Sequence, residues 1–94
     1  MTFRQFIIER DIPAAGSLGR EQLQAAAAKS NDVLRQLAPR IQWVESFVTA
    51  DKLFCVYLAD DPETIREHAE KSGFPATRIT EVRKRIDPMT ASAA

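Results

Sequence analysis

The segment Ile41–Ala59, IQWVESFVTADKLFCVYLA, decides the fold of this chain. Two stretches of alternating side chains flank the short polar break Thr49–Asp51, which is the pattern of an antiparallel β-hairpin closed by a loop of about three residues. With this loop, Val48 pairs with Lys52, and each residue before Val48 pairs with one after Lys52. The sequence therefore predicts a hairpin at the centre of the domain.

The register of this hairpin sorts its side chains onto two faces of a sheet. Counting back from the loop places Glu45 opposite Cys55 and Trp43 opposite Tyr57. These four share one face because side chains alternate along a strand with a period of two. The other face is expected to be the core, and it carries Val44, Ser46, Phe54, Val56 and Leu58. The first face thus gathers a carboxylate, a thiol, a phenol and an indole.

Two amphipathic helices are expected on either side of the hairpin. In Arg20–Leu37, apolar and small residues recur at the i, i+3, i+4 spacing of one helical stripe. The second helix is expected to begin after Asp61 as N-cap, with Pro62 at its first position, and to stop at Gly73. Its inward stripe is formed by Ile65, His68, Ala69 and Ser72.

Strands are expected at about Phe3–Arg10 and about Thr80–Ile86, where apolar and polar residues alternate. The order β-α-β-β-α-β predicts an α+β fold, a ferredoxin-like two-layer sandwich with an antiparallel sheet and both helices on one face. We expect a single domain over residues 1–88 and a flexible C-terminal tail over residues 89–94.

The helices of such a sandwich leave one face of the sheet uncovered. By the alternation above, that face shows Ile7, Glu9, Trp43, Glu45, Phe47, Cys55, Tyr57, Glu81 and Arg83. It is too apolar and aromatic to be left wholly in water. We therefore expect a homodimer in which the two open faces pack together around a partly polar cavity.

The composition of the 94 residues limits the function classes. The 13 basic and 13 acidic side chains cancel, with a pI near 6.6, so no overall field favours nucleic acid or an anionic membrane. The single cysteine excludes an internal disulfide and a multi-cysteine metal cluster, and a reducing cytoplasm is the expected location. No segment approaches the roughly 20 apolar residues of a membrane span.

A family resemblance is carried by three segments: IERDIP at Ile8–Pro13, WVESFVTADKLFCVYLA in the hairpin, and IREHAEKSGFPATRITEV at Ile65–Val82. They resemble the small bacterial nickel-binding, nickel-responsive proteins, which were long catalogued as a domain of unknown function. The similarity covers nearly the whole chain. It implies a ferredoxin-like dimer that binds Ni²⁺ and acts in nickel sequestration or tolerance.

Five side chains are candidate ligands for such an ion: Glu9, Glu45, Cys55, Tyr57 and His68. The opposed Glu45 and Cys55 would offer a carboxylate and a thiolate, and His68 or Glu9 would complete an N/O/S set suited to nickel. The chain has no strong ligand motif of the HxxxH or CxxC kind. The alternatives are that Cys55 is a small core residue and that His68 is a core histidine bonded to the sheet, at Ser46.

Two other function classes stay open. In an enzyme, the face of Trp43, Glu45, Cys55 and Tyr57 would be an active-site cavity, with Glu45 as a general base or Cys55 as a nucleophile. In a plain interaction module, the aromatic face would serve dimerisation alone. A pocket for an organic ligand would favour the enzyme, and a dry interface would favour the interaction module. Clusters of carboxylate or imidazole groups would favour a metal-binding protein. We assign no catalytic residue.

Overall fold

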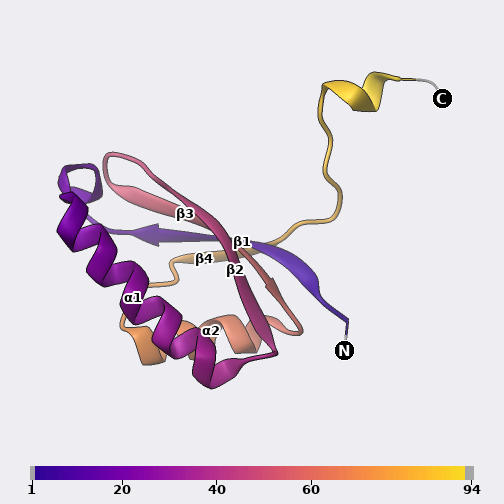
Figure 1. Ribbon diagram of the computed structural model, residues 1–94. Coiled ribbons are helices and arrows are strands. Elements are labelled where there is room, and N and C mark those ends of the chain that lie inside the picture. Colours follow the sequence, from indigo (N-terminus) through magenta and orange to yellow (C-terminus); the bar gives the residue numbers. More distant parts are fainter. Residues whose placement is uncertain (1, 93–94) are drawn as a thin grey trace.

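A computed structural model describes residues 2–92 of the chain. One antiparallel sheet has the strand order β2-β3-β1-β4, and two helices lie against one of its faces (Figure 1). The strands are β1 (Arg4–Asp11), β2 (Ile41–Val48), β3 (Lys52–Ala59) and β4 (Arg78–Glu81); the helices are α1 (Arg20–Leu37), α2 (Pro62–Ser72) and the short 3-10 turns η1 (Ala15–Ser17) and η2 (Pro88–Ala91). This architecture is α+β and compatible with the predicted ferredoxin-like fold.

Both long helices begin and end where local signals place them. The Asp61 side chain accepts a hydrogen bond of 2.8 Å from the Glu63 N–H and so caps the start of α2. At the other end, Gly73 has φ of 80°, a left-handed conformation that strains residues with a Cβ atom. The helices bury the stripes expected of them, including Ser30, Val33 and Leu37 on α1 and Ile65, His68 and Ser72 on α2.

The hairpin forms as predicted, but its register was wrong by one residue near the loop. Val48 pairs with Leu53, because the Lys52 carbonyl is used inside the turn, where it accepts from the Thr49 N–H at 2.8 Å. As a result Ser46 stands opposite Cys55.

A β-bulge between Trp43 and Glu45 corrects this shift farther along β2. Glu45 pairs with Val56 and Trp43 with Tyr57, so Val44 is the extra residue of the bulge. The expected pairing of Trp43 with Tyr57 is therefore confirmed, whereas the opposition of Glu45 and Cys55 was wrong.

The register also decides which face of the sheet meets the helices. Cys55 pairs with Ile8 and Tyr57 with Phe6, and all four are buried beneath α1 and α2. The prediction that Cys55, Tyr57 and Trp43 lie on the open face was wrong, because the alternation of side chains along a strand does not say which of its two faces the helices cover. The face away from the helices, called the outer face below, carries Ile7, Glu9, Glu45, Phe47, Phe54, Val56 and Leu58.

The sheet ends earlier than the sequence pattern indicates. β4 stops at Glu81, and the last ladder contact is from the Val82 N–H to the Gln5 carbonyl at 2.8 Å. Three successive cations follow at Arg83–Arg85, and the chain then runs away from the sheet to η2 (Figure 1). A domain over residues 1–88 with a flexible tail over 89–94 stays a prediction, and residues 93–94 lie outside the described part. No helix within residues 2–92 is long and apolar enough to cross a membrane.

Candidate functional site

A buried arginine lies at the end of β1 on the helix-covered face of the sheet. Arg10 is 2% exposed, and its guanidinium lies 5.9 Å from the ring centre of Tyr57 and 6.0 Å from that of Phe74. Its Nη1 donates to the Pro75 carbonyl at 2.9 Å, whereas its Nη2 has no hydrogen-bond partner within residues 2–92. The core therefore contains a cation with one unsatisfied donor group.

His68 lies beside this arginine in the contact between α1 and α2. Its side chain is 0% exposed, its Nε2 lies 3.0 Å from Ser30 Oγ, and its ring centre lies 5.4 Å from that of Tyr57. Burial, together with the nearby Arg10 charge, lowers the pKa of His68 from 6.5 to about 4. The imidazole is thus neutral at pH 7.

The expected hydrogen bond from His68 to Ser46 was wrong, because both side chains have other hydrogen-bond partners. Ser30 of α1 is the partner instead, and Ser46 accepts from Trp43 Nε1 at 2.9 Å. His68 Nδ1 is left without a partner in the described structure. The histidine is therefore hydrogen-bonded between the two helices, and its ring packs near Tyr57 of β3.

Tyr57 belongs to the same polar group. Burial raises its pKa, and the nearby Arg10 charge opposes this shift. Arg10, Ser30, Tyr57 and His68 therefore form a compact polar cluster in an otherwise apolar layer, and the phenol stays protonated at neutral pH.

A cavity of about 590 Å³ opens beside this cluster, between α1 and the hairpin. It brings together Trp43, Cys55 and Tyr57, which the sequence placed on one face, and Ser46 takes the position expected for Glu45. The other lining residues are mostly apolar: Ile12, Leu18, Leu23, Ala26, Ala27, Val48, Leu53, Phe74 and Pro75, with Arg10, Gln22 and Ser30. A space of this size accommodates a small organic molecule.

The carboxylates predicted as metal ligands, Glu9 and Glu45, lie on the outer face, where the sequence placed them. Glu9 is held by Lys52, with Oε1 and Nζ 3.5 Å apart, while exposed Glu45 takes part in no ion pair with the described residues. Glu9 and Glu45 are thus separated by the sheet from Cys55, Tyr57 and His68. Across residues 2–92, no group of three or more His, Cys, Asp or Glu side chains is arranged to hold a metal ion.

Sequence reasoning missed Arg10 and Ser30 as members of a site. The signal for Arg10 was available, because it continues the inward alternation of Phe6 and Ile8 along β1. Ser30 lay on the predicted stripe of α1, but its contact with His68 depends on how the two helices pack.

The comparisons with known proteins agree on one family. A family of nickel-responsive proteins, described as "Nickel responsive protein SCO4226-like", matches residues 6–82. The chain belongs to this family. The crystal structure of SCO4226 from Streptomyces coelicolor A3(2) has a similar fold, with a TM-score of 0.74 and 15% sequence identity over 87% of this chain and 99% of that chain. At this identity the likeness supports the fold alone, and no curated protein matches.

Proposed function

We propose that this member of the nickel-responsive family binds nickel ions in the cytoplasm and serves in nickel sequestration or tolerance. The observation that carries the proposal is the family match, which spans residues 6–82 and so includes most of the sheet and both long helices. The structure then bears on where an ion would bind.

The helix-covered face is an unfavourable environment for a divalent cation. The Arg10 guanidinium is buried there with one donor unsatisfied, and it already lowers the pKa of His68. A second cation at short range in a medium of low dielectric would be repelled strongly. Although Cys55, Tyr57 and His68 carry suitable donor atoms, we therefore do not include them in the proposed site.

The outer face offers carboxylates in a setting that suits a shared site. Its exposed apolar side chains include Ile7 at 38% and Phe47 at 55%, which a second copy of the same face would cover. A twofold axis through this face would bring both copies of Glu45 to one interface, with both copies of Glu9 nearby. We propose that nickel binds between the two subunits, where oxygen donors from both are pooled.

The enzyme alternative loses the general base that the sequence proposed for it. Glu45 pairs with Val56 on the outer face, so it does not line the cavity that contains Trp43, Cys55 and Tyr57. Glu45 and the proposed metal site thus lie on the outer face, whereas the cavity for an organic ligand lies on the helix-covered face.

Calorimetric titration of the metal-free protein with nickel, cobalt, zinc and copper tests the proposal. Nickel should bind the wild type, and Glu45→Gln should weaken it by at least about tenfold, equivalent to about 1.4 kcal/mol. Glu70→Gln removes an exposed carboxylate on α2 and serves as the matched control, which should bind as the wild type does. Absence of nickel binding, or binding that Glu45→Gln leaves unchanged, would refute the site proposed here.

A further inference from the structure

Among the described residues, the charge of Arg10 has no counterion. None of the ion pairs among residues 2–92 includes this arginine, although its side chain is almost completely buried. A buried charge without a partner is costly, and buried guanidinium groups normally meet a carboxylate or phosphate. The guanidinium lies over the rings of Tyr57 and Phe74, and its Nη1 donates to the Pro75 carbonyl. Its Nη2 has no hydrogen-bond partner among the described residues.

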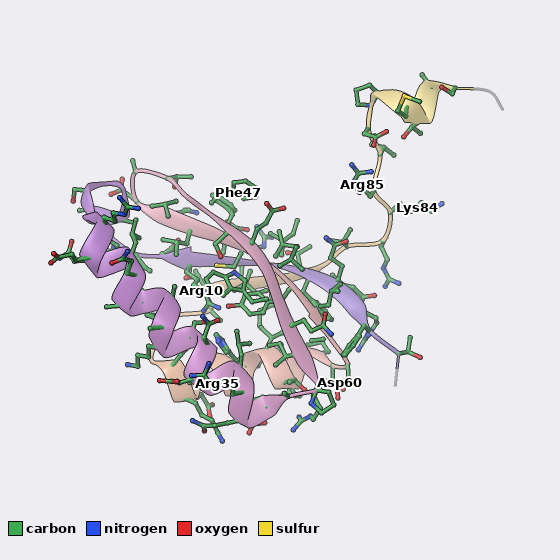
Figure 2. The ribbon with its side chains drawn as sticks, in the orientation of Figure 1. Arg10, Arg35, Phe47, Asp60, Lys84 and Arg85 are labelled. Carbon is green, nitrogen blue, oxygen red and sulfur yellow. The ribbon has the colours of Figure 1, made fainter. Side chains whose placement is uncertain are left out.

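The space beside Arg10 results from the sequence of α1. Toward the C-terminal end of this helix, Val33 and Leu37 fill the gap to the sheet and are buried. One to two turns earlier, the same stripe carries Ala26 and Ala27, whose short side chains leave the cavity open. The small residues and the unpaired cation thus lie at one place, as Figure 2 shows for Arg10 between α1 and the sheet.

The cavity has one polar end and a long apolar wall. Arg10, Ser30 and Tyr57 line the polar end, and Leu23 and Leu53 are among the apolar residues that line the remainder. A ligand that fits must carry negative charge at one end, because a cation would be repelled by Arg10 and a neutral molecule would leave its charge uncompensated.

We propose that the cavity binds a small organic monocarboxylate, with its carboxylate on Arg10 and its apolar body between α1 and the hairpin. The carboxylate accepts from the guanidinium, a charge-assisted bond that is stronger in a desolvated site than in water. Arg10 lines the cavity while its Nη2 is buried, so binding includes a small side-chain shift of the kind common at binding surfaces. This ligand site is independent of the nickel site on the outer face.

Titration of the wild-type protein with matched probes tests the charge requirement. Decanoate and 2-naphthoate represent a linear and a flat carboxylate, and decanol and 2-naphthalenemethanol are their neutral counterparts. Trp43, the single tryptophan, lines the cavity and reports binding through its emission. At least one carboxylate should bind saturably, with one site per chain, and at least about tenfold more tightly than its alcohol.

Variants then locate the site. Arg10→Met should abolish the preference for the carboxylate over the alcohol, whereas Arg66→Met, which removes an exposed arginine of α2, should not. Ala26→Phe should fill the cavity and weaken all four probes, so the proposal stays testable if Arg10→Met does not fold. The proposal is refuted if neither carboxylate binds saturably, if acid and alcohol bind equally, or if Ala26→Phe leaves binding unchanged.

Discussion

Three titratable side chains meet on the covered face of the sheet: Arg10, Tyr57 and His68. Only one of them is charged at pH 7. The guanidinium is charged, while burial keeps the phenol and the imidazole neutral. This arrangement is consistent with a site for an anion, because one fixed positive charge faces neutral donors. It also makes His68 a core residue whose protonation opposes folding.

The stability of the protein should therefore fall as His68 becomes protonated. Its folded-state pKa of about 4 lies below its ordinary 6.5, so the unfolded chain binds the proton first as the pH falls. The contribution is fully present above pH 6.5, decreases through the interval down to pH 4, and amounts to about 2–3 kcal/mol between pH 7 and pH 4.5. Urea denaturation at the two pH values measures the loss.

The matched variant for this prediction is His68→Gln, which cannot titrate. Its unfolding free energy should be lower at pH 7, because the contact with Ser30 is disturbed, but should change less with pH than that of the wild type. The pKa of Asp60 is lowered mainly by its hydrogen bond from Thr64, so its contribution to stability is lost at acid pH. This loss is the same in both proteins and cancels when their pH dependences are compared. Equal pH dependence in both proteins would contradict the burial of a neutral histidine.

At the scale of elements, the hairpin shows how one inserted residue changes the face on which a side chain lies. The turn shifts the register by one residue, and the bulge at Val44 shifts it back, so only the stretch from Glu45 to Val48 changes faces relative to the simple alternation. Bulges redirect side chains in this way without disturbing the rest of a strand. Glu45 is thereby turned away from Cys55 and toward the outer face.

Deletion of Val44 should be tolerated, because it removes the residue that has no partner in the ladder. Trp43 would still pair with Tyr57 and Glu45 with Val56, so we expect a loss of less than about 1.5 kcal/mol of unfolding free energy and unchanged Trp43 emission. Deletion of Val56 from β3 is the control and should prevent folding, since it shifts the pairing with both β1 and β2. A Val44 deletion as damaging as the Val56 deletion would contradict the observed bulge.

The sequence determines some of these elements more firmly than others. The cap at Asp61, the stop at Gly73 and the stripe of α1 are local signals, and they predicted both long helices correctly. The faces of the hairpin depend on hydrogen bonds made by Lys52 in the turn, which the alternation of side chains does not encode. The cavity is harder still to predict, because its wall includes Phe74 and Pro75, which reach Arg10 only through the packing of the whole chain.

At the scale of the whole molecule, the two faces of the sheet differ in what covers them. The helices cover one face, while the outer face and the C-terminal segment expose large apolar side chains, among them Phe47, Ile86 and Met89. The C-terminal segment extends away from the sheet, and the chain measures 46 Å along its longest axis (Figure 1). Both features are consistent with association between copies of this chain.

We predict a homodimer through the outer face, which light scattering at micromolar concentration would report as twice the chain mass of 10.5 kDa. Phe47→Glu should shift the protein to monomers, because it places a charge in the centre of the buried face. Gln24→Glu adds the same charge on the exposed side of α1 and should leave the dimer intact. A wild-type protein that stays monomeric at these concentrations would exclude the shared metal site.

The central claim, that nickel binds to outer-face carboxylates and not to the covered face, is tested most directly by X-ray absorption at the nickel K-edge. The nickel-loaded protein should show a first coordination shell of oxygen donors, identical in the wild type and in Cys55→Ser, because the Cys55 thiol is buried on the other side of the sheet. A sulfur donor in the first shell that disappears in Cys55→Ser would contradict the account and assign the metal to the covered face.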